Sequence, residues 1–145
     1  MKYLLDTNIL SEIRKHNGNA NVKTFIKNIH NEDLYISVIT IGEIAAGIKK
    51  LGNKRKAAEL TIWLEKELLS WFEGRILSIH TNTMIQWGEL QAKANRTLPI
   101  MDSLIAAVAL TYKLALVTRN TKDFADYENL TLINPCFPPS RKVRN

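Results

Sequence analysis

The chain has 145 residues, 46% of them hydrophobic, and a formal net charge of +6 at pH 7. Its length fits one domain with a single core, and its apolar content excludes an intrinsically disordered chain. The positive charge favours polyanionic partners such as nucleic acid or an acidic protein. The one cysteine, Cys136, excludes an internal disulfide and a zinc cluster made of cysteines.

The sequence has no pattern typical of a membrane span or a secretory leader. The longest helical apolar run, near residues 105–110, is too short to cross a bilayer. Asp6 interrupts the apolar stretch that a signal peptide would need at this point. We therefore expect a cytoplasmic protein that has no contact with a membrane.

Strand-like and helix-like apolar patterns alternate along the chain. In chain order they predict a strand over residues 2–5, a helix over 7–14, a turn-rich break over 16–21, a helix over 22–29, a strand over 34–39, helices over 40–51 and 54–72, a strand over 75–79, helices over 81–94 and 101–112, and strands over 114–118 and 130–134. The proline-rich basic segment 135–145 is expected to be extended. The alternation predicts an α/β fold, a short central parallel sheet flanked by helices, in one domain over residues 1–145.

Carboxylates from four distant segments are expected at one edge of this sheet, where ligands bind outside the carboxyl ends of the strands. Asp6 directly follows the first strand, and Glu43 lies one helical turn after the second. Asp123 follows the strand over 114–118. Asp102 opens a helix that leads into that same strand, so it also lies at the carboxyl edge.

Each acid also has a purely structural interpretation. Asp6 suits a helix N-cap, and Asp102 suits the first turn of a helix, where negative charge favours the helix dipole. The sequence TIGE over 40–43 matches a capping box in which Glu43 bonds the amide of Thr40. Asp123 would equally serve a turn. Independent caps need not gather at one end of a sheet, so the four acids together favour a common site.

Four neighbouring carboxylates repel one another strongly where water is scarce, and bound cations relieve that repulsion. Ligand sets made only of oxygen select hard cations such as Mg²⁺ or Mn²⁺. Such ions activate a water and stabilise the leaving oxygen of a phosphodiester. The acids and the basic composition together favour a metal-dependent nuclease.

Four segments resemble, in order and spacing, the motifs of PIN-domain ribonucleases. They are YLLDTNILSEI (3–13), SVITIGEIAAGI (37–48), LPIMDSLIAAVAL (98–110) and LALVTRNTKDF (114–124). Most similar are the VapC-type toxins of bacterial type II toxin–antitoxin pairs, including the FitB-like branch. The resemblance covers residues 2–133. It implies a PIN-like fold and hydrolysis of RNA, with tRNA as the expected substrate, to inhibit translation.

The resemblance also implies a metal site and partners. Mg²⁺, for which Mn²⁺ can substitute, would be held by four acids: Asp6, Glu43, Asp102 and Asp123. Thr7 and Asn120 would support ligands or waters, and Asn120 and Asp123 share or exchange the fourth role. The implied partners are a cognate VapB-type antitoxin, which fills the active-site groove, and a second copy of the chain in a homodimer. The resemblance does not decide whether one or two ions bind. It also does not decide whether the RNA that is cut is a transfer, ribosomal or messenger RNA.

Other readings compete with the nuclease. A non-catalytic scaffold on the same fold would bind nucleic acid or an antitoxin. A receiver-like phosphoacceptor domain would need an aspartate ending a central strand, and the strand over 75–79 carries none. A histidine-driven ribonuclease would need an acid–base pair, and none of His16, His30 and His80 lies in such a pattern.

Three further features have both a functional and a structural interpretation. The basic stretch over 49–56 and the basic residues of the tail, Arg141, Lys142 and Arg144, would either contact RNA or remain solvated. The tryptophans are expected in core or dimer contacts rather than as platforms for RNA bases: Trp63, Trp71 and Trp87.

Overall fold

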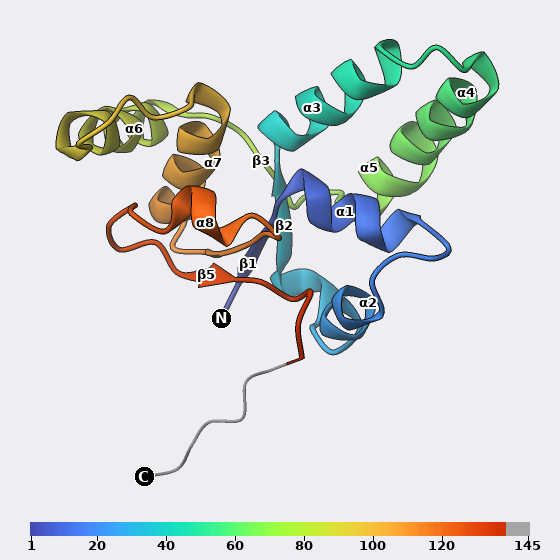
Figure 1. Ribbon diagram of the computed structural model, residues 1–145, viewed down its shortest axis with the longest axis horizontal. Coiled ribbons are helices and arrows are strands. Elements are labelled where there is room, and N and C mark those ends of the chain that lie inside the picture. Colours follow the sequence, from blue (N-terminus) through green and yellow to red (C-terminus); the bar gives the residue numbers. More distant parts are fainter. Residues whose placement is uncertain (139–145) are drawn as a thin grey trace, which may run out of the picture.

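The computed structural model describes residues 1–138, which form a layer of parallel strands between two layers of helices (Figure 1). The elements in chain order are β1 (Tyr3–Leu5), α1 (Thr7–Arg14), α2 (Ala20–Lys27), the 3-10 turn η1 (Asn31–Asp33), β2 (Leu34–Ser37), α3 (Val38–Lys49), α4 (Lys54–Ile62), the π-helical turn η2 (Trp63–Leu68), α5 (Leu69–Trp71), β3 (Ile76–Leu77), α6 (Thr81–Lys93), α7 (Ile100–Thr111), β4 (Ala115–Val117), α8 (Thr121–Phe124) and β5 (Leu132–Ile133). The predicted α/β class, a parallel sheet flanked by helices, is confirmed.

The five strands are parallel and lie in the order β3-β2-β1-β4-β5. The first strand is therefore central, with Tyr3 paired to Leu34 on one side and to Ala115 on the other. Leu5 at its end pairs with Val117 of β4. Because neighbouring parallel strands end at the same edge, the residues that follow β1, β2 and β4 meet there.

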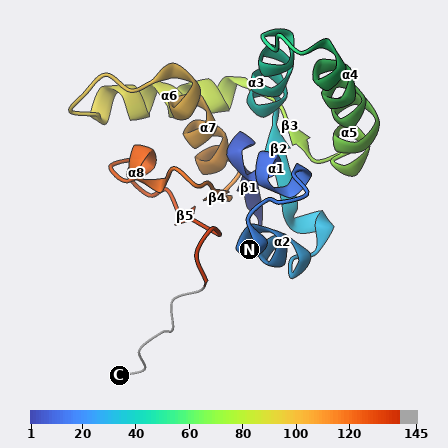
Figure 2. The ribbon, with the colours of Figure 1, turned by 45° about the vertical axis from the view of Figure 1, so that its right-hand side comes forward.

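Two cores cover the two faces of the sheet, because successive strand side chains point to opposite faces. Leu4 and Leu116 pack with buried residues 105–109 of α7. Leu5 and Val117 face the other way, toward α1, α3 and η2. Figure 2 shows α6 and α7 on one side of the strands and the α3–α5 hairpin on the other. All three tryptophans pack against these cores, so the predicted core contacts are confirmed.

The junction between β2 and α3 corrects the predicted boundary. The strand expected over 34–39 ends at Ser37, and the helix expected over 40–51 begins at Val38. Ser37 is the N-cap, and its buried hydroxyl oxygen accepts a hydrogen bond from the Thr40 amide at 3.4 Å. The predicted capping box between Thr40 and Glu43 is therefore wrong. The Glu43 side chain is free to reach across to α1.

Several elements differ from the expectations in detail. The helix predicted over 54–72 is continuous, but Trp63–Leu68 form a π-helical turn. Leu64 and Leu68 are both buried and four residues apart, as in an ordinary α-helix. The apolar pattern therefore could not predict the π-helical turn. The turns η1 and α8 are too short to produce a recognisable apolar period.

The C-terminal segment expected to be extended begins with a turn at Pro135 and Cys136. The Cys136 carbonyl accepts hydrogen bonds from the side chains of Asn19 at 3.3 Å and Asn21 at 2.9 Å. These bonds tie the end of β5 to the start of α2. The rest of the predicted basic tail, residues 139–145, lies outside the described residues. Within residues 1–138, no helix combines the length and apolarity needed to cross a membrane.

Candidate active site

Four helices bring the predicted acids to the carboxyl edge of the sheet (Figure 1). Asp6 precedes α1, Glu43 lies in α3, and Asp123 lies in α8. Asp102 is in the first turn of α7, which leads through a short turn into β4 and thus runs antiparallel to that strand. The carboxylates affect one another electrostatically: Asp6 and Asp102 both raise the pKa of Glu43, and Asp6 and Asp123 both raise that of Asp102. The predicted convergence of distant segments is therefore seen in the structure.

Asp6 is both the cap of a helix and the centre of a polar network. Its Oδ1 accepts a hydrogen bond from the Thr7 amide at 2.8 Å, as an N-cap does. Its Oδ2 accepts from the Thr118 hydroxyl at 2.8 Å and from the Asn8 side-chain amide at 3.3 Å. Only 8% of Asp6 is exposed, and these three donors fix the direction of its carboxylate.

Thr7 joins the first two acids. Its amide donates to Asp6, and its hydroxyl donates to Glu43 Oε1 at 2.9 Å. Burial raises the pKa of Glu43 above its usual value, the bond from Thr7 opposes this rise, and the negative charges of Asp6 and Asp102 add to it. The threonine therefore orients one acid while it caps the helix that carries the other.

Burial is also the main cause that raises the pKa of Asp102, followed by the charges of Asp6 and Asp123, while Arg96 opposes the rise. Asp102 is not the N-cap of its helix, a position held by Pro99. Its carboxylate accepts no hydrogen bond within residues 1–138. A half-buried carboxylate beside two others, without donors of its own, is poorly stabilised unless a cation binds.

Replacing Asp102 with asparagine is expected to raise the thermal midpoint of the metal-free protein at pH 7. A carboxyl pKa that is raised in the folded state contributes stability at low pH, and this contribution is lost as the pH rises through the folded value. Asparagine carries no charge, so the variant does not suffer this loss of stability at pH 7. It also removes the repulsion between Asp102 and Glu43. Melting curves with EDTA and with Mg²⁺ would test this, since the same variant should lose any stabilisation by Mg²⁺. A lower midpoint in EDTA would contradict the electrostatic account.

The fourth acid, Asp123, is more exposed to solvent than Asp6 and Asp102. Asp123 is exposed, and its amide donates to the Asn120 carbonyl at 3.0 Å. The Asn120 side chain is also exposed and does not cap α8. Asn120 lines an open groove beside Asp123 rather than contacting the other acids. Asp123 therefore supplies the charge at this position, and Asn120 supplies a neutral amide in the same groove.

Thr118 and Asn8 were missed by the sequence reasoning. Thr118 is fully buried, and its oxygen accepts bonds from the Asn120 amide at 3.1 Å and the Asn8 side chain at 3.3 Å while its hydroxyl donates to Asp6. Asn8 in turn accepts from the Arg119 amide at 3.0 Å. Had the pairing of β1 with β4 been known, it would have placed Thr118 next to Asp6, because these residues directly follow the paired Val117 and Leu5. These bonds hold the loop after β4 against the start of α1.

The acids fit a hard cation by chemistry, because every candidate donor is an oxygen. Within residues 1–138, no group of three His, Cys, Asp or Glu side chains is close enough together to coordinate one ion directly. Mg²⁺ keeps several of its waters and needs few direct protein ligands, so its binding does not require three acids in direct contact with the ion. Asp6, Glu43, Asp102 and Asp123 would then hold the ion partly through water.

Two open grooves meet at α8. One, of about 470 Å³, is lined by Arg96, Asp102 and Lys122 among others. The other, of about 590 Å³, is lined by Arg119 and Asn120, and both grooves share Lys122 and Asp123. Two of the four acids, Asp102 and Asp123, thus border grooves that are open to solvent.

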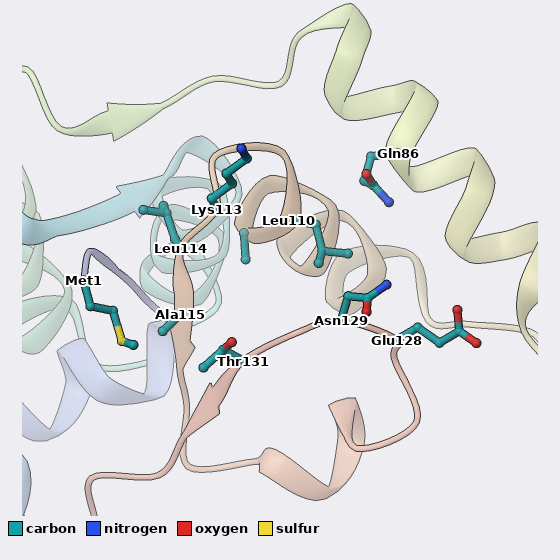
Figure 3. Close-up of a pocket in the computed structure, with 10 residues that line it drawn as sticks. Met1, Gln86, Leu110, Lys113, Leu114, Ala115, Glu128, Asn129 and Thr131 are labelled. Atoms are coloured by element: carbon teal, nitrogen blue, oxygen red, sulfur yellow. The ribbon is translucent and has the colours of Figure 1, made fainter.

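A separate cavity of about 420 Å³ lies at the opposite edge of the sheet (Figure 3). Its lining includes Met1 before β1, Ala115 at the start of β4 and Thr131 before β5. Glu128 is the one carboxylate in this lining, and none of the four predicted acids borders it. It does not have the properties of a metal site.

The PIN domain family matches residues 3–130 of the chain. The chain is 37% identical over 135 residues to the plasmid stability protein StbB of Pseudomonas syringae pv. tomato, covering 91% of this chain and 96% of that protein. It is 30% identical over 138 residues to the VapC ribonuclease Y4jK of Sinorhizobium fredii, covering 93% and 98%. The chain belongs to the PIN-domain toxin ribonucleases of the VapC and FitB type. The toxin is accordingly a nuclease that hydrolyses phosphodiester bonds.

Solved structures agree with this family. The crystal structure of FitAcB from Neisseria gonorrhoeae matches the toxin with a TM-score of 0.85 at 31% identity, covering 92% of the toxin and 97% of that chain. A toxin–antitoxin complex from Klebsiella pneumoniae matches with a TM-score of 0.65 at 28% identity, covering 92% and 98%. The predicted PIN-like fold is therefore confirmed.

Proposed function

We propose that the toxin is an Mg²⁺-dependent endoribonuclease that cleaves tRNA and so inhibits translation, with Mn²⁺ able to replace Mg²⁺. The observation that carries this proposal is the position of Asp6, Glu43, Asp102 and Asp123 on four distant segments that meet at the carboxyl edge of the sheet. Repulsion between neighbouring carboxylates opposes folding without a cation and favours the binding of one. The net charge of +6 suits an RNA substrate, and we place the reaction in the cytoplasm, where tRNA is available.

Asp6, Glu43 and Asp102 would hold the ion, and Asp123 would orient the attacking water or a second ion. A bound Mg²⁺ supplies charge stabilisation and lowers the pKa of a water that serves as nucleophile. Thr7 and Thr118 fix the carboxylates of Glu43 and Asp6 before the substrate arrives. Attack by water in line with the departing O3′ leaves a 5′-phosphate and a 3′-hydroxyl.

The direct test is incubation of the purified toxin with tRNA, ribosomal RNA and messenger RNA, each in Mg²⁺, Mn²⁺ and EDTA. Discrete tRNA fragments with 5′-phosphate ends, absent in EDTA, are expected. Fragments with 2′,3′-cyclic phosphates would point to a metal-independent mechanism through the 2′-hydroxyl. Inertness toward all three RNAs in both metals would favour the alternative, a scaffold that binds nucleic acid or an antitoxin without catalysis.

Two protein partners follow from the same proposal. A cognate VapB-type antitoxin would occupy the groove beside Asp102 and Asp123. The structure from Klebsiella pneumoniae that the toxin resembles is itself a toxin–antitoxin complex. A homodimer is supported by exposed apolar side chains on α6 and α7, namely Met84, Ile85, Ile100 and Met101. Sedimentation of the toxin over a range of concentrations would give the mass of a dimer, whereas a monomer throughout would exclude this contact.

A further inference from the structure

Three cations line the two grooves beside the acids, and they differ in what holds them. The grooves contain Arg96, Arg119 and Lys122. All three are exposed or half-exposed, so each is accessible from solution. Whether a cation is free to bind a phosphate depends on whether a carboxylate of the toxin already neutralises it.

Arg96 is engaged by the toxin itself. Its Nε and Nη2 donate to the two oxygens of Asp126 at 2.9 and 3.0 Å, a bidentate pair, and Nη2 also donates to the Asp123 carbonyl at 3.3 Å. The pair lowers the pKa of Asp126 and raises that of Arg96, so both stay charged. The guanidinium also lies 5.7 Å from the centre of the Tyr127 ring. Arg96 therefore serves mainly to tie α8 to the segment before α7.

Arg119 is engaged in a similar way. Its Nη1 lies 3.1 Å from Glu12 Oε1, and its amide donates to Asn8. Glu12 is only 15% exposed in its side chain, and its second oxygen accepts from the Asn19 amide at 2.8 Å. Breaking this pair would leave the half-buried carboxylate of Glu12 unneutralised, so Arg119 is available to a phosphate only at that cost in free energy.

Lys122 differs from both arginines. Its ammonium forms no ion pair and no side-chain hydrogen bond with any residue in the part of the chain that the structure describes. It is also the one cation that lines both grooves, next in sequence to Asp123. Both grooves begin beside Asp123, so an RNA strand that leaves the acids along either groove meets Lys122.

We infer that Lys122 binds a phosphate of the RNA strand next to the scissile one, which makes it a substrate-positioning residue of this nuclease. The inference rests on the proposed cleavage of RNA at the four acids. A lysine supplies a compact point charge with three donors, which suits a phosphate that approaches from either groove. Because the contact is to the backbone, it should act on all RNA sequences alike.

The test is binding of a labelled single-stranded RNA, followed by fluorescence anisotropy in Ca²⁺ over a range of KCl concentrations. Lys122→Gln is expected to weaken binding roughly tenfold, as for one lost charge-assisted hydrogen bond. It should also reduce the slope of log K against log salt by about 0.7, the value for one phosphate contact on a single strand. Lys122→Arg should restore both quantities in large part.

The matched control is Lys66→Gln, which removes the same charge from an exposed position in η2, away from both grooves. Equal effects of the two glutamine variants would mean that only net charge matters, and would overturn the inference. So would an unchanged slope in Lys122→Gln, or a change of slope only in Lys54→Gln of the basic stretch 49–56.

The outcome for Lys122 is separable from the outcome for the proposed function. Binding that depends on Lys122 in a toxin that cuts no RNA would refute the proposed cleavage but keep the phosphate contact. Cleavage by Lys122→Gln with an unchanged kcat/KM would refute the contact but keep the nuclease. A raised KM with little change in kcat is the expected result. Absence of any RNA binding by the wild type would overturn the inference.

Discussion

Replacing Asp6 with asparagine is expected to reduce Mg²⁺-dependent cleavage by at least about a thousandfold, which equals ~4 kcal/mol of lost transition-state stabilisation. The carboxylate charge that would hold the ion disappears, whereas the fold should remain. Asparagine is as good an N-cap as aspartate, so it can still accept the bond from the Thr7 amide at the start of α1. The new amide would face the Thr118 oxygen, which already accepts bonds from the Asn120 amide and the Asn8 side chain, so a modest fall in the melting temperature is expected beside the loss of activity.

The measurement is the rate of cleavage of the RNA on which the wild type proves active, together with the far-ultraviolet spectrum and the melting curve of the variant. Asp33→Asn is the matched control, because Asp33 lies in η1 just before β2, at the opposite edge of the sheet. The control should keep full activity. A folded Asp6→Asn variant with the rate of the wild type would mean that Asp6 is only a helix cap.

Replacing Thr118 with valine is expected to lower both stability and activity. Valine has the same shape, but it leaves one oxygen of Asp6 without its closest donor and deprives the Asn120 amide of its acceptor. The loss of such buried hydrogen bonds costs about 1–3 kcal/mol in free energy of unfolding. Residues that orient a metal ligand typically contribute about 10- to 100-fold to metal affinity or activity.

Denaturant unfolding and the Mg²⁺ dependence of cleavage measure the two effects separately. Thr118→Ser keeps the hydroxyl and should restore the Mg²⁺ dependence. Thr111→Val is the matched control, because the Thr111 hydroxyl donates only to the Ala107 carbonyl, at the far end of α7. If Thr118→Val loses stability but needs no more Mg²⁺ than the wild type, the threonine supports the fold rather than the position of Asp6.

The sequence was sufficient for the sheet and for the acids at its carboxyl edge, because both follow from the alternation of elements. The position of Asp102 is a clear example. Its helix had to run antiparallel to β4, and that placed the acid at the carboxyl edge of the sheet, the edge at which Asp6 also lies. Charge in an otherwise apolar segment is a strong local signal, and the direction of a helix follows from short connections.

What the sequence could not supply depends on contacts between distant segments. The hydrogen bond from Thr118 to Asp6 requires the pairing of Leu5 with Val117. The sequences of β1 and β4 do not reveal that these two strands are neighbours. The early start of α3 was missed because Val38 and Ile39 are β-branched and continue the strand pattern. The buried cap at Ser37 overrides that local preference. The uncharged side chains of Thr118 and Asn8 could not be recognised as part of the site before their neighbours in space were known.

A crystal of the toxin grown with Mn²⁺ would test the central claim most directly, because the anomalous scattering of manganese locates the ion. The account predicts a peak bordered by the carboxylates of Asp6, Glu43 and Asp102, with Asp123 at its open side and waters completing the coordination. The Asp6→Asn variant should lose that peak. A peak at another place, or none in a crystal soaked at millimolar Mn²⁺, would contradict the metal site and with it the proposed mechanism.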